Sequence, residues 1–118
     1  MPIVDIELVI RKEEVLPNGL ASTLADALGE VFGSPPARLW VRLRTLPDSQ
    51  YAENLGDAPR PVFVTLLFAA PPTGDLLRLQ VKQVTQVVAS ICRCPAEQVH
   101  VLLEAAAEGR IAFGGELT

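Results

Sequence analysis

The sequence predicts an α/β (α+β) fold made of two consecutive β-α-β units, which form a four-stranded mixed sheet with two helices on one face. Three observations predict it. Residues 3–10, 39–43, 62–68 and 99–103 have the alternating or continuous apolar character of short strands. A stripe of apolar residues at helical spacing follows the first strand, and another follows the third. The order strand, helix, strand therefore occurs twice, once from Pro2 and once from Pro61.

The first half begins with a strand at residues 3–10, where apolar side chains on one face alternate with Asp5 and Glu7 on the other. A turn at residues 17–19 leads into a helix that ends at the Gly33-Ser34-Pro35-Pro36 segment. The second strand follows at residues 39–43. The helix is predicted from the spacing of Leu20, Leu24, Leu28, Val31 and Phe32.

The second half repeats the first, element by element. Thr65 is the only polar residue of the strand at residues 62–68, as expected of a strand buried on both faces. The next helix contains Leu77, Val81, Val84, Val88 and Ile91, and the last strand covers residues 99–103. Three residues of the first helix recur sixty positions later in the second: Leu24, Leu28 and Val31 correspond to Val84, Val88 and Ile91.

Size and composition favour a single domain over residues 1–118, with pseudo-repeats 2–46 and 61–105 and a C-terminal tail 106–118. A net charge of −4 gives no reason to expect binding to nucleic acid. No apolar run approaches the roughly 20 residues of a membrane span, and no basic segment precedes an apolar one at the N-terminus. We therefore expect no membrane partner and a cytoplasmic location.

Metal and cofactor chemistry are not expected from the sequence. The two cysteines, Cys92 and Cys94, and the single histidine, His100, are too few for a structural zinc site. A redox pair is conceivable for the cysteines, but burial as small apolar residues is the interpretation that we favour. Right-handed β-α-β crossovers place both helices on one sheet face, so the other face needs a cover, for which a symmetric oligomer is the simplest solution.

Several segments resemble the tautomerase superfamily, which includes 4-oxalocrotonate tautomerase and macrophage migration inhibitory factor. Met1-Pro2 is followed at once by a strand, and the Leu16-Pro17-Asn18-Gly19-Leu20 and Gly33-Ser34-Pro35-Pro36 segments match the first half of macrophage migration inhibitory factor. Residues 99–101 and 109–117 are similar to the end of 4-oxalocrotonate tautomerase. The resemblance implies a homotrimer, an active site around an N-terminal proline near subunit boundaries, and no cofactor.

Pro2 is the predicted catalytic base if Met1 is removed. An N-terminal proline is a secondary amine, with a reference pKa of about 7.7–8.0 that burial lowers. Such an amine can move a proton between carbon and oxygen next to a carbonyl. The predicted enzyme is an isomerase that catalyses keto–enol tautomerisation of a small 2-oxo or unsaturated carboxylic acid. The alternatives are hydratase, dehalogenase or decarboxylase chemistry on small acids, or a non-catalytic trimeric binding protein.

Two further residues are predicted to assist Pro2. Alternation places Arg38, Trp40, Arg42 and Arg44 on one face of the second strand, and Arg42 suits a substrate carboxylate. His100 occupies a family arginine position and is a candidate hydrogen-bond donor or acid. The alternative for both is a structural role. For Arg38 and Arg44 we favour solvated charges that protect an edge strand.

The remaining predicted substrate contacts are distributed along the chain. Lys12 falls where the family has an arginine in its first loop, and Ile111 falls on an aromatic of the tail, with Phe113 two residues on. Tyr51 and Asn54 belong to the polar loop between the halves, which is long enough to cover a site. The alternative for this loop is an ordinary linker between the halves, and the alternative for Trp40 is a role in packing. The full substrate-binding prediction is Lys12, Trp40, Tyr51, Asn54, Ile111 and Phe113.

Overall fold

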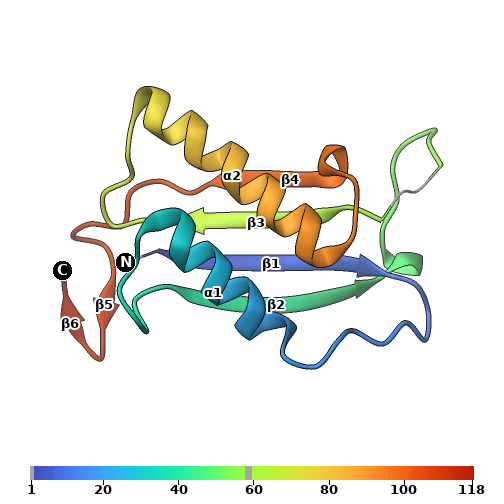
Figure 1. Ribbon diagram of the computed structural model, residues 1–118, viewed down its shortest axis with the longest axis horizontal. Coiled ribbons are helices and arrows are strands. Elements are labelled where there is room, and N and C mark those ends of the chain that lie inside the picture. Colours follow the sequence, from blue (N-terminus) through green and yellow to red (C-terminus); the bar gives the residue numbers. More distant parts are fainter. Residues whose placement is uncertain (1, 58–59) are drawn as a thin grey trace.

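The computed structural model describes residues 2–57 and 60–118, and the predicted fold class is confirmed (Figure 1). The first half consists of strand β1 (Ile3–Ile10), helix α1 (Leu20–Phe32) and strand β2 (Trp40–Pro47). The second half consists of β3 (Val62–Leu67), α2 (Gly74–Cys92) and β4 (Val99–Leu103). Short 3-10 helices at Asp48–Gln50 and Ala96–Gln98 and a small hairpin, β5 (Ala112–Phe113) with β6 (Glu116–Leu117), complete the chain.

The four long strands form one mixed sheet in the order β2-β1-β3-β4. Within each half the two strands are parallel, and the two halves join through the antiparallel pair β1 and β3. The register aligns His100 with Phe63, Phe63 with Glu7, and Glu7 with Arg44 across the sheet. A second row aligns Leu102 with Thr65, Asp5 and Arg42, two residues closer to the start of β1.

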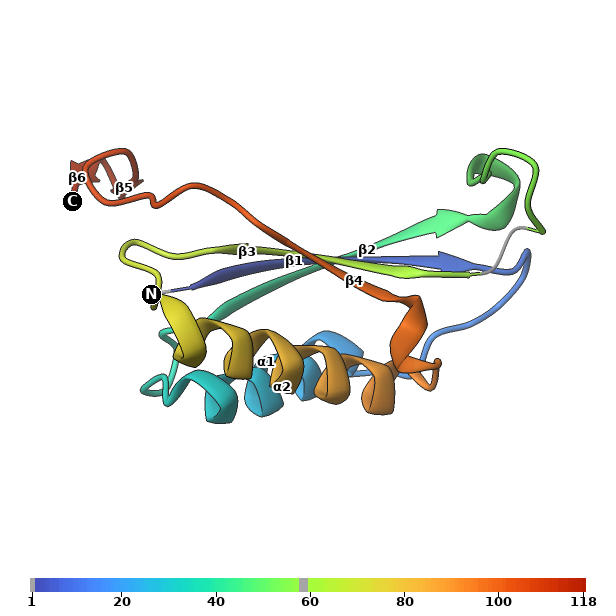
Figure 2. The same ribbon diagram turned by 90° about the horizontal axis from the view of Figure 1, so that it is seen from above.

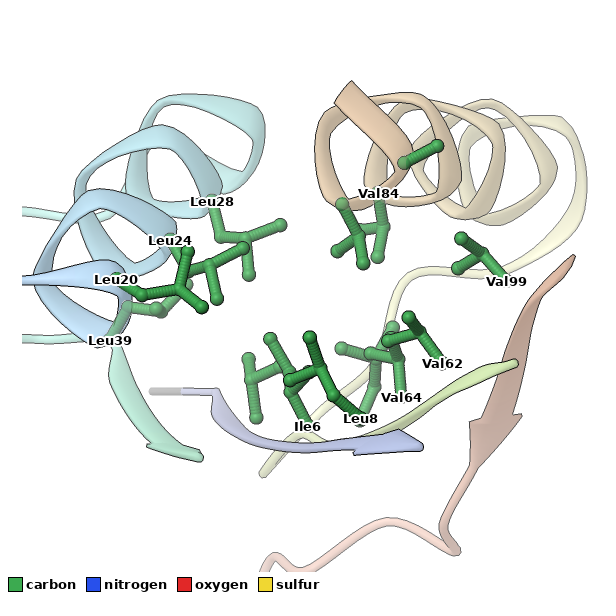
Figure 3. Close-up of a cluster of buried hydrophobic side chains, with 14 of the residues drawn as sticks. Ile6, Leu8, Leu20, Leu24, Leu28, Leu39, Val62, Val64, Val84 and Val99 are labelled. Atoms are coloured by element: carbon green, nitrogen blue, oxygen red, sulfur yellow. The ribbon is translucent and has the colours of Figure 1, made fainter. Parts of the chain in front are cut away.

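Both helices pack side by side on one face of the sheet, and the other face is free of helices (Figure 2). The core lies between these layers, where alternate strand residues meet the apolar stripes of the helices (Figure 3). Val4, Ile6, Leu28, Val64 and Val88 are among its least exposed side chains. The alternation that predicted β1 thus reflects burial against the helices. Strand β3 is predicted to be buried on both faces, but in the single chain its side chains are buried only on the helix side and partly buried on the other.

The helix-free face carries a mixture of apolar and charged side chains. Trp40 and Leu102 are 42% and 62% exposed, and Phe63 and Leu67 are partly buried. Asp5, Glu7, Arg42 and Arg44 lie on the same face. The tail crosses to this side of the molecule, and its β5–β6 hairpin lies at the end of the sheet where β1 begins (Figures 1 and 2).

No helix among residues 2–57 and 60–118 is both long and apolar enough to cross a bilayer. Within the same residues, no three histidine, cysteine, aspartate or glutamate side chains gather where they could hold a metal ion. The removal of Met1, on which the sequence-based mechanism depends, concerns a residue outside those described.

Candidate active site

Pro2 is buried at the start of β1, where it lines a pocket of about 610 Å³. Its carbonyl accepts a hydrogen bond from the backbone N–H of Trp40 (3.2 Å), which extends the β1–β2 pairing up to Pro2. We call this cavity the Pro2 pocket. It lies between the end of α1, the end of β3 and the first turns of α2. Its lining consists of Pro2, Phe32, Gly33, Ser34, Pro35, Arg38, Phe68, Ala70, Pro72 and Gln80.

The Pro2 pocket has an apolar floor and few polar groups. Phe32 and Phe68 meet edge to face, with their ring centroids 5.3 Å apart. Arg38 is the only charged residue in the lining, and Ser34 and Gln80 are the other polar ones. Among the described residues, no carboxylate lies within ion-pair distance of Arg38. An apolar pocket with a few converging polar groups is typical of a small-molecule site.

Arg38 reaches this pocket because it lies in a turn, which corrects the prediction that it shares a strand face with Arg42. Strand β2 begins at Trp40, and Ala37 has a left-handed backbone conformation (φ 63°) that interrupts the alternation. The Arg38 N–H donates to the Pro35 carbonyl (3.1 Å), and the Trp40 indole Nε1–H donates to the Ala37 carbonyl (3.1 Å). Trp40 therefore holds the turn that carries Arg38.

A second pocket of about 620 Å³ lies at the other end of β1, and its lining corresponds to that of the Pro2 pocket with an offset of sixty residues. It contains no terminal amine, since Val62 stands at the position of Pro2 and the preceding Pro61 is internal. The polar groups also differ. Leu20, Cys94 and Gln98 occupy the positions of Gln80, Ser34 and Arg38.

Arg42 lies outside the Pro2 pocket, on the helix-free face of the sheet. Its guanidinium makes two hydrogen bonds to Asp5, with Nε–Oδ1 at 2.5 Å and Nη2–Oδ2 at 2.7 Å. This pairing lowers the pKa of the Asp5 carboxyl and raises the pKa of Arg42. The fork that would bind a substrate carboxylate is thus occupied within the chain, so the predicted role of Arg42 would require Asp5 to be displaced.

His100 also lies away from Pro2 in the same chain. It aligns through Phe63 with Glu7, which is five residues along β1 from Pro2 and hence roughly 17 Å from it. The Phe63 ring lies between His100 (centroids 5.6 Å apart) and Tyr51 (6.0 Å). The Tyr51 hydroxyl donates to Glu53 Oε2 (2.6 Å), which raises the pKa of Tyr51. His100 and Tyr51 therefore lie together at the far end of the sheet.

The other predicted contacts divide between the two ends of the sheet. Trp40 and Phe113 meet edge to face, 5.5 Å between centroids, near the start of β1. Ile111 lines a smaller cavity of about 280 Å³ beside Leu67. Lys12 and Asn54 are exposed in the segments that follow β1 and β2, and neither lines the Pro2 pocket. The structure thus brings only Pro2, of all the predicted site residues, into that pocket, and the roles of the others stay predictions.

Cys92 and Cys94 line the second pocket as partly buried free thiols. Burial, with a smaller contribution from Cys94, raises the pKa of Cys92 to about 11, and burial also raises the pKa of Cys94. At pH 8 only about one Cys92 in a thousand is then a thiolate, which is the nucleophilic form.

We therefore expect Cys92 to resist iodoacetamide at pH 8 in the folded protein and to react at least tenfold faster in denaturant. Peptide mapping by mass spectrometry measures both rates. Equal rates in the folded and unfolded chain would contradict the burial described here. Slow thiol labelling also means that an electrophile applied near neutral pH is not consumed by this cysteine.

Known structures are similar to the chain over almost its whole length. A fused 4-OT, a wild-type symmetric trimer, has a TM-score of 0.80 at 16% identity, over 98% of this chain and 94% of that one. Pt0534 inactivated by 2-oxo-3-pentynoate has a TM-score of 0.78 at 19% identity, over 98% and 94%. The macrophage migration inhibitory factor of Trichinella spiralis has a TM-score of 0.78 at 15% identity, over 98% and 99%.

Sequence comparison adds nothing to this structural similarity, because no family model and no curated protein matches the chain. At identities this low, the structural neighbours establish the fold.

Proposed function

We propose that this chain is a cofactor-independent isomerase that interconverts the keto and enol forms of a small 2-oxo or unsaturated carboxylic acid. Its fold is that of the tautomerase/macrophage migration inhibitory factor superfamily. The observation that carries the proposal is the burial of Pro2 in a pocket whose only charged lining residue is an arginine without a carboxylate partner among the described residues. The proposal requires that Met1 be removed.

In the proposed reaction the Pro2 nitrogen is the base. Its lone pair takes a proton from the carbon next to the substrate carbonyl. The electrons of that C–H bond form the carbon–carbon double bond, and the carbonyl pair moves onto oxygen. The Pro2 ammonium then gives its proton to this oxygen, which yields the enol and restores the free amine. The reverse sequence returns the ketone, and the Pro2 amine is regenerated in either direction. Burial helps because it disfavours the ammonium form, leaving more free amine at neutral pH.

Arg38 is our candidate for the group that binds the substrate carboxylate, in place of Arg42. A guanidinium can form two parallel hydrogen bonds with a carboxylate, and those of Arg38 are not used by an acidic side chain of the described residues. The turn at residues 35–38, which the backbone and Trp40 indole hydrogen bonds stabilise, would keep the Arg38 side chain beside Pro2. The pocket volume, about 610 Å³, is within the usual range for small-molecule sites.

The direct test is turnover of phenylenolpyruvate by protein that begins at Pro2. We expect isomerisation by the parent and its loss in Pro2→Ala. Unchanged activity in that variant would end the proposal.

We also propose that the chain forms a homotrimer through the helix-free face. The fused 4-OT neighbour is a symmetric trimer. Leu102 and Trp40 are exposed on this face of the single chain, where burial would remove apolar surface from water. Trimer formation would also give His100 a route to substrate. In its own chain His100 lies two strands away from Glu7, which is itself roughly 17 Å from Pro2, so it can act only from another copy.

Disruption of this face should dissociate the assembly. We expect the parent to have three times the 12.7 kDa mass of one chain in light scattering, and Leu102→Glu to shift the mass towards a single chain. Leu79→Glu is the matched control, because Leu79 is similarly exposed (52%) but lies on α2. A monomeric parent, or a trimer that survives Leu102→Glu, would contradict the proposed interface.

A further inference from the structure

The side-chain oxygen Oε1 of Gln80 is buried and has no hydrogen-bond partner, and it is the one such side-chain atom among residues 2–57 and 60–118. Gln80 lies on α2 and lines the Pro2 pocket. Buried polar atoms in proteins are nearly always hydrogen-bonded, so an acceptor without a donor needs an explanation. Gln80 as a whole is partly buried, and we look for the donor among the groups that share the Pro2 pocket with it.

The second pocket provides an internal comparison. At the position of Gln80 it has Leu20, which is buried (7% exposed) and needs no hydrogen-bond donor. At the position of Pro2 it has Val62, next to the internal Pro61, whose nitrogen is an amide without hydrogen. The buried acceptor thus occurs in the pocket that contains Pro2, and an apolar residue replaces it in the pocket that contains Val62.

Loss of Met1 would create a suitable donor inside the Pro2 pocket. While Met1 is attached, the Pro2 nitrogen carries no hydrogen; once it is removed, the protonated amine carries two. We propose that Gln80 is a positioning residue for the base, and that its Oε1 accepts a hydrogen bond from the protonated Pro2 amine. This inference rests on the proposed function, because it needs a free amine at Pro2.

The charges of the Pro2 pocket make this hydrogen bond significant for the base. Arg38 is the only charged residue in the lining, and no aspartate or glutamate faces Pro2 there. Arg38 therefore disfavours the ammonium form, whereas the Gln80 oxygen favours it and so raises the pKa of Pro2. One N–H directed at Gln80 leaves the second directed into the pocket, where it can return the proton to substrate.

The experiment measures the reactivity of the Pro2 amine without relying on turnover. 2-Oxo-3-pentynoate, the compound that inactivates the structural neighbour Pt0534, has a triple bond activated by a carbonyl and can add to a free amine. The rate of adduct formation at Pro2 is followed by mass spectrometry as a function of pH. The rate should rise with pH to a plateau, and the midpoint is the pKa of Pro2.

Gln80→Leu introduces the residue type that the first half has at this position, Leu20. It should lower this midpoint by about one pH unit, since the ammonium form loses its acceptor. Below both midpoints the variant should then react about tenfold faster than the parent, while the plateau rate at high pH stays the same; greater exposure of Pro2 through damage to the fold would change the plateau rate as well. Gln80→Glu should raise the midpoint. Gln83→Leu is the matched control, because Gln83 is exposed on the same helix, and its midpoint should equal that of the parent.

Two outcomes would overturn the inference in distinguishable ways. A reactive Pro2 whose midpoint is unchanged or higher in Gln80→Leu would overturn the role of Gln80 alone. A parent whose Pro2 forms no adduct at any pH would overturn the proposed function and the role of Gln80 with it.

Discussion

Pro2→Ala should lower kcat/KM for phenylenolpyruvate about 10³-fold, within the range usually lost with a general base. Alanine leaves a primary amine at the N-terminus, but without the ring the nitrogen is no longer held in one direction. The loss should appear mainly in kcat, because the base acts on the transition state more than on substrate binding. Steady-state kinetics of the purified variant measure both constants.

Pro61→Ala is the control for this variant. Pro61 opens the second half of the chain and is fully buried, but its nitrogen is an internal amide that cannot accept a proton from substrate. Its substitution should leave kcat within about twofold once circular dichroism shows that the variant is folded. Equal losses in Pro2→Ala and Pro61→Ala would indicate that packing near the strand starts, and not a free amine, supports turnover.

Arg38→Ala should lower kcat/KM roughly 10- to 100-fold, the loss expected when a charged hydrogen-bonding partner of a carboxylate is removed. Most of the loss should appear as a higher KM, because the carboxylate is bound in both substrate and transition state. Arg38→Lys should recover only part of it, since an ammonium keeps the charge but loses the two-pronged geometry.

Two comparison variants decide what Arg38 does. Gln98→Ala removes the corresponding residue of the second pocket and should leave both constants unchanged. Arg42→Ala tests the residue that strand alternation selected. If Arg42→Ala raises KM as much as Arg38→Ala or more, carboxylate binding belongs to Arg42, and the pair with Asp5 must open in the complex.

Much of the fold could be predicted from the sequence because it depends on periodicity. The alternation in β1 and the stripe from Leu20 to Leu28 are direct consequences of burial on one face, and the structure confirms them. The sixty-residue offset indicated that the second half repeats the first. The predicted mixed sheet is confirmed, but the strand order that makes β1 and β3 the joining pair depends on contacts between the halves, which local patterns do not reveal.

The candidate site was harder to predict, for reasons that individual residues make clear. The sequence predicts Arg38 to lie on a strand, because an alanine at position 37 gives no sign of a left-handed turn. That conformation is usually adopted by glycine or asparagine. The sequence predicts that His100 and Tyr51 act with Pro2, but the strand register places His100 towards the other end of the sheet, and the ring contact with Phe63 places Tyr51 there too.

Gln80 was missed because a single glutamine on a helix is no signal by itself. Its significance appears only when the offset pairs it with Leu20 and when the burial of its oxygen is known. The first of these two facts is visible in the sequence, because the duplication pairs the apolar Leu20 of the first helix with the polar Gln80 of the second.

The central claim is that the Pro2 nitrogen is a free amine within the pocket. It is tested most directly by the intact mass and the peptide map of natively expressed protein before and after treatment with 2-oxo-3-pentynoate. We expect a chain that begins at Pro2 and gains one adduct, located on the Pro2 nitrogen. A chain that retains Met1, or an adduct formed elsewhere while Pro2 stays unmodified, would contradict it.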